Sequence, residues 1–100
     1  MTTRTDYHSI LELKKVYKPE TCGFVTKREA ALIRETLELD TRSDIELQNI
    51  RDMVVMLYGQ MFAEHARSKQ GHDEAGSYLD ARSAITHVID SVKLQRGLEI

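Results

Sequence analysis

The sequence predicts an all-α fold: a small helical bundle of about four helices, built on a long antiparallel helical hairpin. Apolar residues recur three and four positions apart instead of alternating, which is the helical period. Only one proline and five glycines interrupt the 100 residues, so long helices have room to form. This length allows one modest core, and we expect residues 1–100 to form a single helical domain.

The first short helix is expected over residues 6–17, with Thr5 as its N-cap. It must end before Pro19, because proline disfavours the helical conformation in the residue that precedes it. The apolar side chains of its inward face are Ile10, Leu13 and Tyr17.

The second short helix is expected over residues 27–39. Thr26 is followed three residues later by Glu29, which is the spacing of a capping box at a helix start. Its apolar face carries Ala30, Ile33 and Leu37.

The third helix is expected over residues 44–69 and is the longest element. Ser43 and Glu46 repeat the capping-box spacing at its start. Apolar residues then follow at spacings of three and four, as in a coiled-coil seam: Leu47, Ile50, Val54, Leu57 and Met61.

The fourth helix is expected over residues 77–96. Ser77 and Asp80 offer another capping pair, and Gly97 stands where a glycine commonly ends a helix. A second seam has the same spacing: Tyr78, Ala81, Ile85, Val88 and Val92. Two matched seams joined by a short polar loop predict an antiparallel hairpin.

Apolar residues surround the middle of the third helix. Six of them follow one another over residues 53–58, and at about 100° per residue they cover its whole circumference. A chain of this length has few other elements to cover them, so we expect a homo-oligomer, with a two-fold dimer favoured. The alternative is a monomer in which the short helices enclose the long one.

Composition and charge limit the partners and the location. The net charge is −2, with 14 basic and 16 acidic residues, so no global field attracts nucleic acid or an anionic membrane. No apolar stretch approaches the roughly 20 residues that cross a bilayer. Cys22 is the single cysteine and has no partner for an internal disulfide. We therefore expect a cytoplasmic protein with no membrane association.

No pattern in the chain is typical of a catalytic, metal or cofactor site. A metal centre in a helical bundle uses pairs such as Glu-x-x-His, and this spacing does not occur. Nucleophile motifs and glycine-rich phosphate loops are also missing from the sequence. We expect no enzyme activity, no catalytic residues, no bound metal and no cofactor.

One local charge cluster lies between the first two helices. Lys14 and Lys18 stand at the end of the first helix, and Lys27 and Arg28 open the second, where the helix dipole disfavours positive charge. If the intervening loop folds back, these side chains and the free N–H groups of the second helix form an anion site. The simpler alternative is a solvated basic patch paired with Glu20 and Glu29.

These observations favour a non-enzymatic regulatory, inhibitor or adaptor protein that acts by protein–protein interaction and self-associates through its long helix. Flexible methionines and aromatic side chains suit such a surface, and the expected interaction residues are Met53, Met56, Tyr58 and Phe62. The alternative is a binding module for an anionic ligand, a nucleotide or a nucleic-acid phosphate, in the basic region from Lys14 to Arg28.

Overall fold

The computed structural model describes residues 2–20, 24–68 and 72–97. Within these ranges the chain forms four α-helices and one short 3₁₀ helix, with no strand, which confirms the predicted all-α class. The elements in chain order are α1 (Thr2–Val16), α2 (Lys27–Thr36), the 3₁₀ helix η1 (Leu39–Thr41), α3 (Asp44–Ala66) and α4 (His72–Gln95). None of the helices in these ranges is long and apolar enough to cross a membrane.

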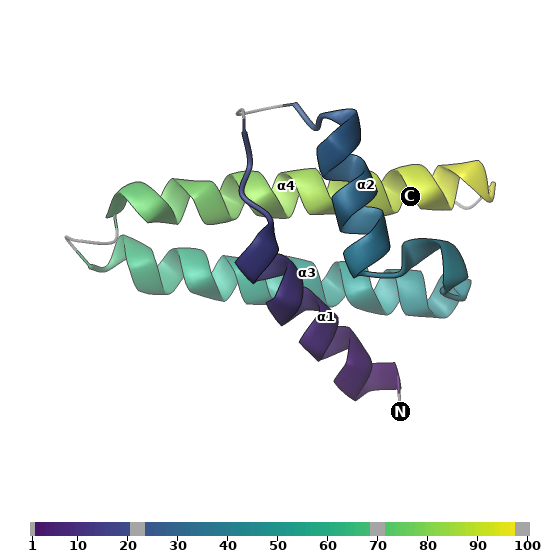
Figure 1. Ribbon diagram of the computed structural model, residues 1–100. Helices are drawn as coiled ribbons and strands as arrows, with labels where there is room; N and C mark the ends of the chain where they lie inside the picture. Colours follow the sequence, from purple (N-terminus) through teal and green to yellow (C-terminus); the bar gives the residue numbers. More distant parts are fainter. Residues whose placement is uncertain (1, 21–23, 69–71, 98–100) are drawn as a thin grey trace.

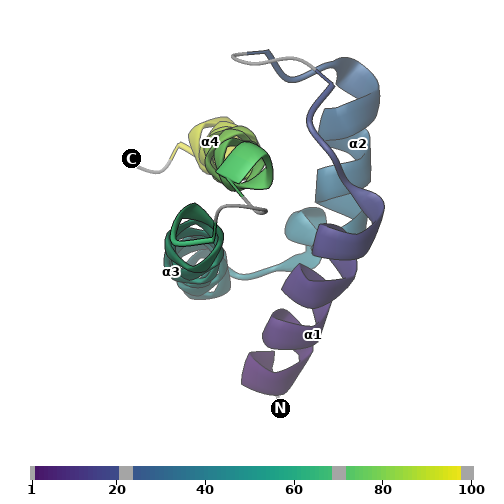
Figure 2. The same cartoon turned by 90° about the vertical axis from the view of Figure 1, so that its left-hand side faces the viewer.

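The helices form two layers. α3 and α4 lie side by side and run in opposite directions, as the predicted hairpin requires (Figure 1). α1 and α2 both cross the hairpin on one side and form the second layer (Figure 2). No element in the described part of the chain covers the other side of the hairpin (Figure 2).

The core lies between the two layers and along the hairpin seam. The predicted inward residues of α1 are all buried, and so are most of those of α4. On α3 the buried row follows the prediction through Val54 and then differs, since Tyr58 is buried whereas the predicted Leu57 and Met61 lie at the core's edge. The fully buried side chains with the largest volumes are Tyr58, Ile10, Leu13, Ile33, Leu37, Leu39, Leu47, Ile50, Ile85, Ile89 and Val54.

Two of the three predicted capping pairs are confirmed. The Thr26 hydroxyl accepts a hydrogen bond from the Glu29 N–H at 3.1 Å, and the Glu29 carboxylate accepts one from the Thr26 N–H at 3.1 Å. Ser43 and Glu46 exchange the same pair of bonds at the start of α3, at 3.2 and 2.9 Å. Each box satisfies N–H groups that a helix leaves without an internal partner, so these starts depend on local sequence alone.

Two helix starts were predicted too late. α1 begins at Thr2 and not near Asp6, since no proline or glycine in the preceding residues stops the helix. α4 begins at His72, so Ser77 lies inside the helix and is not its N-cap. Ala75, in the added turns, is buried, and the longer helix carries Gly76 in its interior at a modest cost.

Two helix ends also differ from the prediction. α2 ends at Thr36, because Glu38 adopts a left-handed conformation with φ 53° and turns the chain into η1. Leu39, expected in the helix, instead enters the core from η1. α3 ends at Ala66, and the expected last residue, 69, lies outside the described residues.

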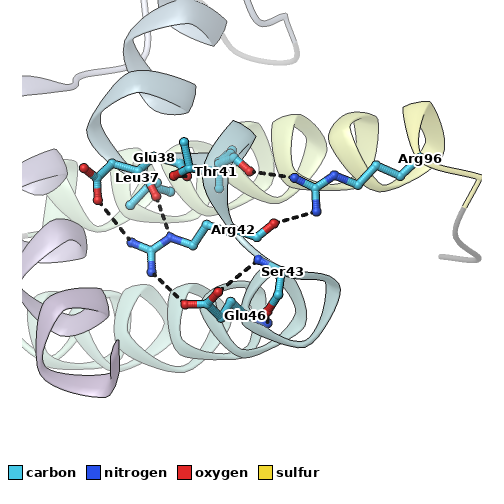
Figure 3. Close-up of polar contacts among 8 residues, drawn as sticks. Leu37, Glu38, Thr41, Arg42, Ser43, Glu46 and Arg96 are labelled. Carbon is cyan, nitrogen blue, oxygen red and sulfur yellow. Dashed lines mark hydrogen bonds and ion pairs between the residues drawn. The ribbon is translucent and has the colours of Figure 1, made fainter. Parts of the chain in front are cut away.

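Arg42 holds the turn between α2 and α3 from within. Its side chain is 5% exposed, and its Nε donates a hydrogen bond to the Leu37 carbonyl at 2.8 Å (Figure 3). The carboxylates of Glu38 and Glu46 lie 4.0 and 3.9 Å from its terminal nitrogens. The buried charge therefore has acceptors on several sides, as burial of a guanidinium requires.

Arg96 ties the end of α4 to the same turn. Its guanidinium donates to the backbone carbonyls of Arg42 at 2.6 Å, Leu39 at 3.2 Å and Asp40 at 3.3 Å. It also contacts the Asp44 carboxylate at 3.2 Å. Arg42 and Arg96 thus bind backbone and carboxylate groups of this chain, so their role is structural (Figure 3).

Candidate functional site

The four expected interaction residues lie in different environments. Tyr58 is 2% exposed and belongs to the core, so it does not contribute to the surface of the folded chain. Met56 is 53% exposed, and its neighbour Val55, which was not among the four, is 38% exposed. Met53 and Phe62 are partly buried. The chain's own helices therefore cover only part of the circumference of α3. Met56 is the most exposed apolar residue in the middle of this helix.

These residues do not form one patch. Met53 and Phe62 are nine positions apart, and nine steps of about 100° place them on opposite sides of α3. Met56 lies next to Met53, three residues away, whereas Val55 and Phe62 are seven apart and share the other side. An interface on α3 must therefore approach either the Met53 side or the Val55 side.

Polar side chains link the two hairpin helices. Arg51 donates two hydrogen bonds to the Asp90 carboxylate, at 2.8 and 3.3 Å, and this bidentate contact raises the pKa of the guanidinium. The Lys93 ammonium donates to the Gln48 side chain at 2.7 Å. Val55 follows Arg51 by four residues, so it lies one turn further along this polar row. These contacts stabilise the hairpin, and they occupy the Asp90 and Gln48 side chains.

The basic residues between α1 and α2 do not converge on one site. Lys14 and Lys18 line one cavity, whereas Lys27 lines a different one. Arg28 is exposed and forms an ion pair with Glu20. The four cations therefore do not line one common cavity among the described residues, and anion binding in the region from Lys14 to Arg28 stays a prediction.

An internal carboxylate already occupies the start of α2. Glu29 is 3% exposed, and it accepts hydrogen bonds from the backbone N–H groups of Thr26 at 3.1 Å and Glu20 at 3.3 Å. Burial alone raises the pKa of Glu29, but these N–H donors outweigh it and hold the pKa below its usual range. The N–H of the N-cap residue Thr26 is thus bound by a carboxylate of the same chain.

A cavity of about 420 Å³ lies where the end of α1 meets the hairpin. Its described lining residues are Lys14, Tyr17, Lys18, Pro19, Tyr58, Ser77, Tyr78 and Ala81. This volume falls in the range of small-molecule sites, roughly 300–1,000 Å³. Sequence reasoning found the two lysines but missed Tyr17, Ser77 and Tyr78, which come together only when the segment after α1 crosses the hairpin.

Aromatic side chains form the wall of this cavity. Tyr78 lies 6.4 Å from Tyr58 between ring centroids and 4.8 Å from His65, and the Lys14 ammonium lies 5.8 Å above the Tyr78 ring. Burial and the neighbouring Tyr78 raise the pKa of Tyr58 to about 12. Burial and the nearby Glu29 carboxylate raise the pKa of Tyr17 above its usual range. Both phenols therefore stay protonated at neutral pH and act as hydrogen-bond donors.

The Tyr58 hydroxyl is buried and has no hydrogen-bond partner among the residues that the structure describes. A buried polar group without a partner costs about 1–3 kcal/mol, so native structures rarely keep one unless something else completes it. The Tyr17 hydroxyl, on the same cavity wall, is also buried, and it lies near the Glu29 carboxylate.

The described residues contain no group of three or more histidine, cysteine, aspartate or glutamate side chains that could hold a metal ion. Cys22, the single cysteine, lies outside the described residues. No protein-family profile, curated protein or solved structure matches this chain.

Proposed function

We propose that this chain is a non-enzymatic, cytoplasmic regulatory, inhibitor or adaptor protein that acts by protein–protein interaction and self-associates through α3. The observation that carries the proposal is the exposure of Met56, on the Met53 side of α3, in the middle of a core helix. Methionine repacks readily against varied surfaces, and exposed apolar residues on one element favour association. The one-sided placement of α1 and α2 supports the same proposal, because it leaves the hairpin accessible to a partner (Figure 2).

Light scattering coupled to size-exclusion chromatography tests the self-association. We expect a dimer for the wild type and a monomer for Met56→Glu, because a charge placed in an apolar contact opposes burial. Met56 is half exposed within one chain, so the variant should keep its helical circular dichroism and its stability to within about 0.5 kcal/mol.

Leu94→Glu is the matched control. Leu94 is also a large exposed apolar residue, but it lies near the end of α4 and not on α3. We expect this variant to remain a dimer. A wild type that is monomeric at high concentration, or a dimer that Leu94→Glu dissociates while Met56→Glu does not, contradicts association through α3.

A second candidate function is a binding module for an anionic ligand. It is favoured by one observation, the placement of Lys14 and Lys18 on the same cavity.

A further inference from the structure

We propose that two copies of this chain associate about a two-fold axis at Met56, so that Arg82 of each copy pairs with the partner's Asp52. The inference rests on the proposed self-association through α3. It goes further by naming the surface that meets and the ion pair that fixes its geometry.

One stripe of residues on α3 points away from the core. Its members, spaced four, three and four residues apart, are Asp52, Met56, Gly59 and Ala63. This is the spacing of a helix-packing seam, and Met56 lies about 200° around the helix from buried Val54. Met56 is 53% exposed and gives the stripe an apolar centre, while the small residues beyond it allow a second helix to come close. Val55 and Phe62 lie outside this stripe.

Arg82 reaches the stripe from α4. A Cβ atom placed on Gly59 would lie 3.4 Å from Arg82 Nη1, so the guanidinium rests against α3 where glycine leaves room for it. Arg82 is partly buried, and its guanidinium forms no ion pair or hydrogen bond with the residues that the structure describes. A guanidinium is always charged and carries five N–H donors, so this position favours an acidic partner.

Asp52 is the acidic group on the same stripe. It is exposed, and its carboxylate accepts a hydrogen bond from the neutral side-chain amide of Gln48 at 3.0 Å. The adjacent cation, Arg51, forms its ion pair with Asp90 on the neighbouring helix. The Asp52 carboxylate therefore retains oxygen lone pairs for a cation of another molecule.

The register of the two groups selects a second copy as the partner. Within one copy, Asp52 and Gly59 are seven residues apart, which is about 10 Å along α3. A two-fold axis at Met56 makes the two α3 helices antiparallel, so positions before the axis face positions after it. Asp52 lies four residues before Met56 and Gly59 three residues after it, so the partner's Asp52 faces Gly59 to within about 1.5 Å along the helix. The partner's Asp52 thus arrives beside Arg82, and the ion pair forms twice.

Charge reversal followed by mixing tests this geometry. Arg82→Glu and Asp52→Arg each bring like charges together twice, so light scattering coupled to size-exclusion chromatography should show a dissociation constant raised by more than about tenfold for each variant alone. An equimolar mixture of the two variants should regain the dimer, because both pairs then join opposite charges. Lys15→Glu is the control, since Lys15 is exposed on α1 and has the same change of charge, and it should remain a dimer.

Arg82→Gln adds a milder change, which removes the ion pair without creating repulsion. We expect it to weaken the dimer several-fold while far-UV circular dichroism stays that of the wild type. If the two charge-reversal variants dissociate and their mixture does not regain the dimer, Arg82 and Asp52 do not meet between copies and the proposal is wrong.

The outcomes for this inference and for the proposed function are distinguishable. A wild-type dimer that Met56→Glu dissociates, but that Arg82→Glu and Asp52→Arg leave intact, supports association through α3 and refutes this geometry. A wild type that is monomeric at high concentration refutes both.

Discussion

Replacing Arg96 by methionine tests how strongly polar contacts hold the α2–α3 turn to α4. Methionine keeps most of the aliphatic length of the side chain and removes the guanidinium. The side chain of Arg96 is 27% exposed, and three of its four partners are backbone carbonyls that belong to one short turn. The variant therefore loses several bonds at once and leaves the carbonyl of buried Leu39 without this donor.

The expected loss follows from these contacts. A hydrogen bond to a charged group contributes about 1.5–3 kcal/mol, and partial exposure to water reduces this to about 0.5–1 kcal/mol for each carbonyl. The ion pair with Asp44, whose side chain is mostly exposed, adds little. We expect the free energy of unfolding to fall by about 2 kcal/mol, of which Arg96→Lys should recover less than half, because one ammonium cannot span three carbonyls.

Urea unfolding followed by far-UV circular dichroism measures this loss. With an m-value of about 1.5 kcal/mol/M, the midpoint should fall by about 1.3 M. Arg67→Met is the control, since Arg67 is exposed and follows the last residue of α3, and its effect should stay within about 0.5 kcal/mol. If Arg96→Met costs no more than Arg67→Met, the turn is held by packing alone and the reasoning is wrong.

Three further changes act on single groups. Glu38→Gly and Glu38→Gln both remove the carboxylate near Arg42, and the glycine variant should exceed the glutamine variant in unfolding free energy by about 0.5 kcal/mol in urea titrations, because glycine adopts φ 53° without strain; equal stability of the two contradicts this. The pKa of Glu29 is lowered in the folded chain. Its ionised carboxylate therefore contributes to the free energy of unfolding above the unfolded pKa of about 4.3, and this contribution is lost as the pH falls through the lower folded pKa. Glu29→Gln should therefore be less stable than wild type near neutral pH and lose less stability than wild type between about pH 5 and 3. If the unfolding free energies of the two proteins change in parallel with pH, the lowered pKa of Glu29 is refuted. Tyr58→Phe should unfold at higher temperature, by about 1 kcal/mol of added stability, since it removes a buried hydroxyl without a partner; a lower melting temperature shows that the hydroxyl is satisfied in the native state.

The sequence predicts best what depends on neighbouring residues. The capping boxes at Thr26 and Ser43 are confirmed because both partners lie within one turn of helix. The apolar period identified the inward faces for the same reason. Glu38 was missed because a left-handed conformation at a non-glycine residue is imposed by the packing of Leu39, which no local pattern reports.

The candidate site was predictable only in part. Lys14 and Lys18 were identified from charge, but their separation from Lys27 depends on the path of the segment after α1. Tyr58 was assigned to the surface because the six-residue apolar run does not say which side the other helices cover. The spacing of residues in the sequence gives their position around a helix. Which other helix covers that position depends on the tertiary structure.

The Glu29 carboxylate links two parts of the chain that are usually independent. One oxygen completes the first turn of α2, and the other accepts the N–H of Glu20, which follows directly after Lys18 and Pro19 in the cavity wall. A displacement of that wall is therefore transmitted through one peptide unit and one side chain to the point where the second helix nucleates. Glu29 is therefore the direct contact between the cavity wall and the first turn of α2.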